Sequence, residues 1–159
     1  MAELVKAASD SPGVIAPPPL IYLGGLAVGI VLHWLKPLPF VPENLALLLG
    51  VAFILISIAL VVTAVRTFIK AKTNIDVRKP TTSIVSTGPY HYTRNPIYLS
   101  MALLTIGIGI WVNTIWILVA LVPVLLVIQF GVIAREETYL TKKFGEEYLW
   151  YKANVRRWL

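Results

Sequence analysis

The chain has 159 residues, of which 57% are hydrophobic and only 14% charged, and its mean hydropathy is +0.76. Soluble domains carry about 25% charged residues, and a small domain has too much surface to bury so many apolar side chains, so a water-soluble globular protein is excluded. The net charge is +6, and the sequence has no cysteine, which excludes disulfides, zinc–thiolate sites and cysteine nucleophiles.

The N-terminal segment, residues 1–19, ends in three prolines and lacks the basic start and cleavage site of a removed signal peptide. Two apolar runs follow it. The first, residues 20–35, would extend about 24 Å as a helix, which is short for a hydrocarbon core of about 30 Å. The second, residues 45–65, holds only two polar side chains and predicts a membrane-spanning helix.

A third apolar stretch, residues 97–134, is far too long for a single crossing. Asn113 and Thr114 lie near its middle and favour a tight turn. We therefore expect two helices, residues 97–112 and 114–134, and about four transmembrane helices in total. The predicted fold is all-α, a multi-pass integral membrane protein.

The distribution of basic residues predicts how a single membrane domain over residues 1–159 is oriented. Residues 66–96 and 135–159 hold twelve of the fourteen Lys and Arg residues. The positive-inside rule places both segments, and both termini, on the cytoplasmic face, where they also attract anionic lipids. The basic residues follow no nucleic-acid-reading motif, which argues against nucleic acid as a partner. The compact size suits a prokaryotic cytoplasmic membrane.

The four expected spans contain no Asp, Glu, Lys or Arg. Ion-coupled transporters usually keep an ionisable residue at membrane depth, so a small transporter or membrane scaffold is a weaker alternative. His33 and Gln129 are interpreted as hydrogen-bond partners between helices. Function is then expected in the two polar cytoplasmic segments.

The first polar segment contains a turn at Gly88-Pro89 and a helix start at Asn95-Pro96. Capping by Asn95 is the simplest interpretation of the second pair. A helix N-terminus also presents free amides and partial positive charge to a carboxylate or phosphate, and Arg94 adds a full charge. Nearby aromatic and imidazole rings either pack against a flat base or form an interfacial aromatic belt; they are Tyr90, His91, Tyr92 and Tyr98.

The second polar segment, residues 135–159, begins with two adjacent carboxylates, Glu136 and Glu137. They are either a solvated pair offset by neighbouring cations or part of a binding site. Glu146 and Glu147 lie further along the chain and are interpreted as surface charges.

In this order and spacing, the motifs resemble the isoprenylcysteine carboxyl methyltransferase and phospholipid methyltransferase superfamily. The resemblance covers about residues 80–158. It rests on Gly88-Pro89-Tyr90, Arg94-Asn95-Pro96-Ile97-Tyr98, Glu136-Glu137-x-x-Leu140 and Phe144-Gly145-x-x-Tyr148-x-x-Tyr151.

The resemblance implies that the cytoplasmic loop and the C-terminal helix enclose S-adenosylmethionine, while a lipophilic acceptor arrives from the bilayer. Arg94 and the Asn95-Pro96 helix start would receive the cofactor's carboxylate, Glu136 its ammonium or a ribose hydroxyl, and the tyrosines its adenine. No metal is implied. The implied cofactor-binding residues are Ile84, Val85, Tyr90, Arg94, Asn95, Pro96, Tyr98, Glu136 and Glu137.

The chain departs from the superfamily pattern at Asn95 (usually His), Ser100 (usually Gly) and Val132 (Arg in prenylcysteine-specific members). Asn95 cannot take up a proton, which excludes a general base at that position; the catalytic residue is open, with Arg94 and His91 as candidates. The departure at Val132 argues against a prenylated cysteine carboxylate as the acceptor, and a carboxylate, a thiol and an amine remain open as acceptor groups. An NADPH-dependent membrane reductase related to sterol reductases is a further alternative, because those enzymes share a similar C-terminal pattern.

Overall fold

The computed structural model describes residues 11–74 and 79–159, and most of this part of the chain is helical. The described residues include no β-strand, and Thr93 and Arg156 form one isolated bridge. The prediction of an all-α protein is confirmed.

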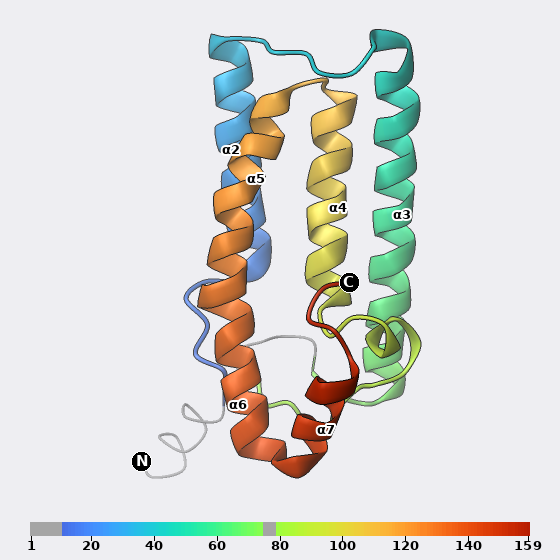
Figure 1. Ribbon diagram of the computed structural model, residues 1–159, viewed down its shortest axis with the longest axis vertical. Coiled ribbons are helices and arrows are strands. Elements are labelled where there is room, and N and C mark those ends of the chain that lie inside the picture. The colour runs from blue at the N-terminus through green and yellow to red at the C-terminus, as the bar shows by residue number, and fades with distance from the viewer. Residues whose placement is uncertain (1–10, 75–78) are drawn as a thin grey trace.

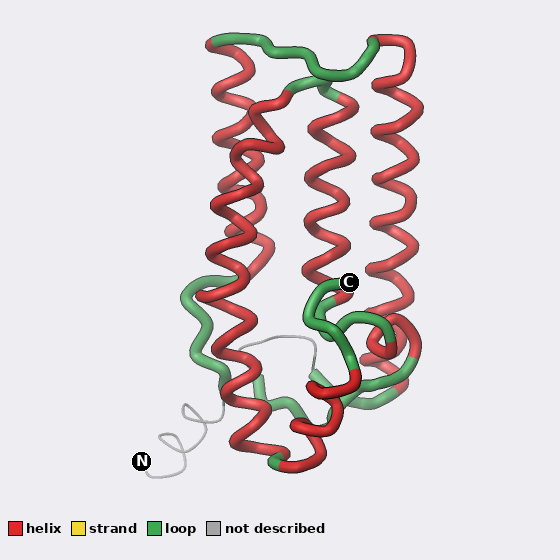
Figure 2. Tube along the Cα trace, viewed as in Figure 1, coloured by secondary structure: helices red, strands yellow, loops and turns green. Residues whose placement is uncertain are grey.

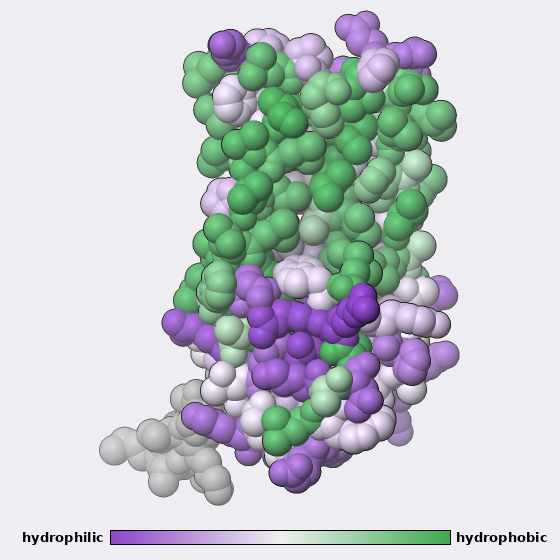
Figure 3. Space-filling view, in the orientation of Figure 1, coloured by the Kyte–Doolittle hydropathy of each residue, from purple (hydrophilic) through white to green (hydrophobic). Residues whose placement is uncertain are grey.

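Four upright helices form the body of the molecule (Figure 1). α3 packs mainly along α4 and α2 mainly along α5, while α4 also contacts α2 and α5. Figure 3 shows a broad apolar band over these helices above a polar lower end. The four helices are α2 (Pro18–Leu35), α3 (Glu43–Lys70), α4 (Pro96–Trp111) and α5 (Ile115–Val127).

Three helices, those that begin at Pro18, Glu43 and Ile115, are long and apolar enough to cross a bilayer. The chain is therefore an integral membrane protein. α4, the remaining expected span, is apolar but has only 16 residues, or about 24 Å. It lies very close to α3, since a Cβ added to Gly50 would come within 2.7 Å of the Trp111 backbone nitrogen. Small residues allow this kind of approach between membrane helices.

The last membrane helix is longer than predicted. α5 continues through the π-helix η2 (Ile128–Ile133) into α6 (Ala134–Phe144). The apolar pattern ends at residue 134, but the polar residues beyond it are mostly good helix formers. The helix therefore carries its acidic pair below the apolar band. α3 likewise extends to Lys70, five residues beyond the predicted end at residue 65.

The predicted turn between the last two spans is present at Asn113. This residue has φ +54°, a left-handed conformation that Asn tolerates better than most residues. Its Oδ1 accepts hydrogen bonds from the amides of Phe40 and Val41, and its Nδ2 donates to the Val41 carbonyl. The side chain thus joins the two loops at the upper end.

The lower end of the molecule collects the polar segments (Figure 2). The loop after α3 contains a short 3₁₀ turn, η1 (Gly88–His91), and leads into α4. Gly145, with φ +55°, separates α6 from α7 (Glu146–Asn154). After α7 the C-terminus turns back beside the start of α4.

Candidate functional site

A cavity of about 510 Å³ lies at the lower end of the bundle. Its walls come from the start of α4, from α6 and α7, from the loop after α3 and from the N-terminal prolines. The structure brings all nine expected cofactor-binding residues to this one cavity: Ile84, Val85, Tyr90, Arg94, Asn95, Pro96, Tyr98, Glu136 and Glu137.

Glu136 faces the cavity from α6 and has a tyrosine as its partner. The Tyr98 hydroxyl donates a hydrogen bond of 2.5 Å to Glu136 Oε1. Tyr98 is itself positioned by Tyr22, whose hydroxyl donates to the Tyr98 carbonyl at 2.9 Å. Contacts from α2 and α4 therefore fix the carboxylate at the cavity wall.

Glu137, the next residue, is 5% exposed and is surrounded by cations. Arg157 donates to both of its carboxylate oxygens, at 2.8 and 2.7 Å. Arg94 Nη1 lies 3.1 Å from Oε1, and Lys152 Nζ lies 3.4 Å from Oε2. One buried carboxylate thus faces three cations, and the hydrogen bond to Glu137 raises the pKa of Arg157.

Arg94 keeps unused hydrogen-bonding capacity in the cavity wall. Its side chain is 9% exposed. Its Nε has no hydrogen-bond partner within residues 11–74 and 79–159. A buried guanidinium N–H without a partner is costly, so an acceptor atom of a ligand would stabilise it.

The C-terminal residues 155–158, here called the clasp, tie the start of α4 to the last membrane helix. The backbone amide of Arg94 donates to the Arg156 carbonyl at 2.9 Å. The side-chain Nδ2 of Asn95 donates to the Arg157 carbonyl, also at 2.9 Å. Trp158 Nε1 donates to Gln129 Oε1 at 2.8 Å. The sequence predicts a hydrogen bond from Gln129 to another membrane helix. Its partner in the structure is instead Trp158 of the clasp.

Asn95 occupies the N-cap position of α4 but does not cap the helix with its side chain. Its Nδ2 instead donates to the carbonyl of Arg157 in the clasp, and this contact orients the side chain toward the C-terminus. The first amides of α4 consequently remain without a side-chain cap at the cavity.

Two tyrosines of α7, Tyr148 and Tyr151, line the cavity although sequence analysis assigned them no role. Burial raises the pKa of Tyr148 to about 12, so its hydroxyl stays protonated at neutral pH. The Tyr151 hydroxyl donates to the Tyr90 carbonyl at 2.8 Å. Their spacing of three residues places both on one face of a helix, and it belongs to the Phe144-Gly145-x-x-Tyr148-x-x-Tyr151 motif of the sequence.

Other cavity residues carried no recognisable signal in the sequence. The prolines of the N-terminal segment marked only the edge of an apolar run, yet Pro12, Pro17, Pro18 and Pro19 line the cavity. Arg157 does not line the cavity but binds its Glu137; in the sequence it belonged to a basic tail, and such tails commonly bind lipid headgroups.

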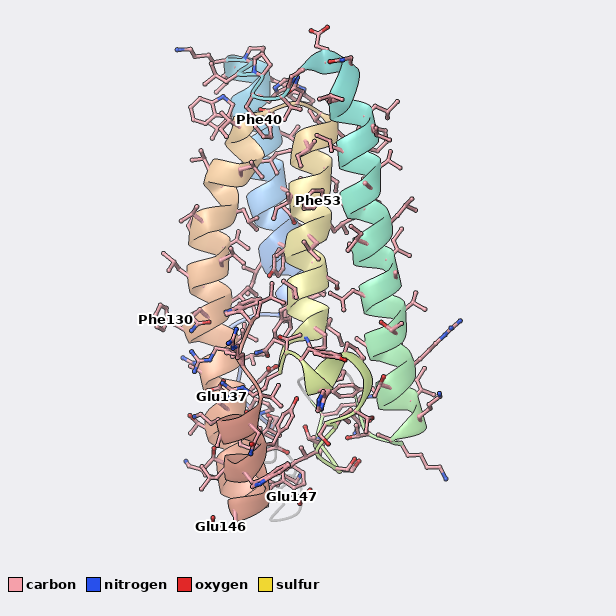
Figure 4. The ribbon with its side chains drawn as sticks, turned by 45° about the vertical axis from the view of Figure 1, so that its right-hand side comes forward. Phe40, Phe53, Phe130, Glu137, Glu146 and Glu147 are labelled. Carbon is pink, nitrogen blue, oxygen red and sulfur yellow. The ribbon has the colours of Figure 1, made fainter. Side chains whose placement is uncertain are left out.

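The structure does not bring His91 into the cavity. His91 is exposed and packs edge-on against the ring of Tyr92, with ring centroids 5.2 Å apart. Glu146 and Glu147 are also exposed, as expected for surface charges. Figure 4 shows them at the lower tip, away from Glu137.

The phospholipid methyltransferase family model matches residues 45–147, roughly two thirds of the chain. The chain belongs to the phospholipid methyltransferase family. The matched range runs from α3 to the start of α7 and includes the Arg94 and Glu136 motifs. The tyrosines of α7, the clasp and the N-terminal prolines lie outside the range that matches this family.

A 63-residue stretch of this chain is 44% identical to a Haemophilus influenzae protein named "Uncharacterized protein". The match covers 40% of this chain and the whole of that protein. No solved structure matches the chain.

Proposed function

We propose that this protein transfers a methyl group from S-adenosylmethionine to a lipophilic or lipid-modified acceptor at the cytoplasmic face of the membrane. Membership of a membrane methyltransferase family supports the reaction class. The cavity at the polar end of the bundle supports the choice of methyl donor.

The observation that carries the proposal is that Arg94 and Glu136 line the same cavity. The methionine end of S-adenosylmethionine bears a carboxylate and an ammonium, so it needs one cation and one anion within reach. Arg94 has an unpartnered Nε, and the three cations at Glu137 outnumber that single carboxylate. Within residues 11–74 and 79–159, no Lys or Arg forms a hydrogen bond or ion pair with Glu136, whose partner is Tyr98. This charge pattern matches a zwitterion better than a purely anionic ligand.

The rest of the cavity also fits this cofactor. Tyr90, Tyr148 and Tyr151 supply aromatic surface for the adenine, and such rings stack favourably on flat bases. The volume of about 510 Å³ falls within the range of about 300–1,000 Å³ that is typical of small-molecule sites.

The chemistry asks the protein mainly for positioning. The sulfonium of S-adenosylmethionine makes its methyl group a good electrophile when it is bound. Arg94 and Glu136 would hold the two charged ends, and the tyrosines would fix the base. Orientation of this kind can account for much of a rate enhancement. A carboxylate or thiolate acceptor needs no strong base, which agrees with the position of His91 outside the cavity.

The cytoplasmic orientation rests on the basic residues. Residues 66–96 and 135–159 hold twelve of the fourteen Lys and Arg. Of these, the described residues 66–74, 79–96 and 135–159 lie at the end that holds the cavity. By the positive-inside rule this end faces the cytoplasm, with both termini on that side. A prokaryotic cytoplasmic membrane is the proposed location.

Calorimetric titration of the purified protein tests the donor. We expect saturable binding of S-adenosylmethionine and of its demethylated product, and no binding of NADPH. Binding of NADPH alone would overturn the proposal in favour of a membrane reductase. Binding of neither would argue for a membrane protein without this enzymatic activity.

A further inference from the structure

The first described residues of the chain lie against the last membrane helix. We call residues 11–19, which lead into α2 and include its first two residues, the N-terminal strap (Figure 1). The Ile15 amide donates to the Gly131 carbonyl at 3.4 Å, and Arg135 Nη1 donates to the Gly13 carbonyl at 2.8 Å. Two hydrogen bonds thus hold the strap on one face of that helix.

A glycine makes this contact possible. A Cβ added to Gly131 would lie 2.4 Å from Ile15 Cδ1, well inside van der Waals contact. Gly131 belongs to the π-helix η2, where the Ala134 amide bonds the Gln129 carbonyl five residues earlier. π-helical turns are rare in proteins, and those that occur are often found at functional sites. A side chain at residue 131 would therefore require the Ile15 side chain to shift.

The strap supplies an apolar wall to the cavity. Four of its residues, Pro12 and Pro17–Pro19, line it. Proline has no amide N–H to donate, and residues 11–19 include no ionisable side chain. Met101 and Ile133 also line the cavity. This wall suits hydrocarbon, whereas the charged groups of the cavity come from Arg94, in the loop before α4, and from Glu136 and Glu137 on α6.

We propose that the N-terminal strap, held by the contact of Ile15 with Gly131, is the wall that limits the size of the lipophilic molecules that reach the cavity. This inference rests on the proposed function, because the molecule selected in this way is the methyl acceptor. It assigns acceptor selection to a segment outside the range matched by the family.

The chain has no cysteine, so a single cysteine can report access to the apolar wall. Met101→Cys places a thiol in the cavity lining. Its reaction rates with N-ethylmaleimide and N-dodecylmaleimide are measured in reconstituted vesicles. The ratio of the long-chain rate to the short-chain rate then measures how strictly the cavity excludes bulky apolar molecules. No cofactor or turnover is needed, so this result is independent of whether S-adenosylmethionine binds.

Gly131→Val displaces Ile15, and we expect it to raise this ratio by about tenfold or more, a barrier change of about 1.4 kcal/mol. Gly24→Val is the matched control, because a Cβ at Gly24 meets nothing within 4 Å; it should leave the ratio unchanged. Arg135→Gln removes the bond to Gly13 without adding bulk and should raise the ratio even if Gly131→Val fails to fold. An unchanged ratio in the folded strap variants would overturn the proposal. An equal rise of this rate ratio in Gly24→Val would also overturn it. Equal rates for the two maleimides in the Met101→Cys protein with an unaltered strap would do the same.

Discussion

At the scale of single residues, Glu136 and Glu137 are neighbours with different surroundings. Successive residues of a helix point about 100° apart, so the two carboxylates face different groups. Glu136 accepts a hydrogen bond from Tyr98 at the cavity wall, whereas both oxygens of Glu137 are occupied by Arg157. We therefore interpret Glu136 as the residue available to a ligand and Glu137 as part of the internal framework.

Replacement of Glu136 by Gln tests the first of these roles. Gln keeps the size of the side chain and an oxygen that can accept from Tyr98, but it removes the charge. A hydrogen bond to a charged group contributes about 1.5–3 kcal/mol, so S-adenosylmethionine affinity should fall on the order of 10- to 100-fold.

Glu146→Gln is the matched control, because Glu146 is exposed and lies away from the cavity. It should change the affinity by less than about twofold. Calorimetry on both variants gives the comparison. Equal affinities for Glu136→Gln and the parent protein would show that Glu136 does not bind the cofactor.

At the scale of elements, Glu137 joins α6 to the clasp and to the start of α4. Glu137→Gln leaves Arg94 and Arg157 without their common anion. Loss of one partner from a buried ion pair costs about 3–5 kcal/mol. The Arg157 side chain is 31% exposed, which favours the smaller of these values. We expect the ligand-free protein to unfold at a clearly lower denaturant concentration in detergent micelles.

Glu147→Gln, which alters an exposed carboxylate of the same C-terminal region, should change stability by no more than about 0.5 kcal/mol. The measurement also separates two interpretations of Glu137. If Glu137 acted only as a cofactor ligand, its replacement would weaken binding without affecting the ligand-free protein.

The elements were largely predictable because their signals are local. Hydropathy located the helices, and the turn chemistry of Asn113 located the upper hairpin. The nine cofactor-binding candidates came from motif order, and they share one cavity. The clasp was not predictable, because Arg157 reaches Glu137 only after the chain reverses at Gly145. Local propensity also misjudged the Asn95 side chain, since its partner is a carbonyl 62 residues away.

At the scale of the whole molecule, the polar lining of the cavity and most of the described basic residues occupy the same end. On the face seen in Figure 3, an apolar band separates the polar lower end from a smaller polar area at the upper loops. An acceptor dissolved in the bilayer and a water-soluble cofactor would therefore meet where the apolar band ends, beside the strap and the start of α4.

This arrangement predicts the accessibility of three exposed positions: Lys70 at the end of α3, Glu146 at the start of α7 and Lys36 at the upper end. Each is replaced singly by cysteine in the cysteine-free chain, so the parent protein gives no background. A membrane-impermeant maleimide applied to intact cells should label Lys36→Cys only, because the positive-inside rule places the other two positions in the cytoplasm. After permeabilisation all three variants should react. Labelling of Lys70→Cys and Glu146→Cys from opposite sides of the membrane would refute the arrangement of the helices. Labelling of both from outside, with Lys36→Cys protected, would refute only the cytoplasmic orientation.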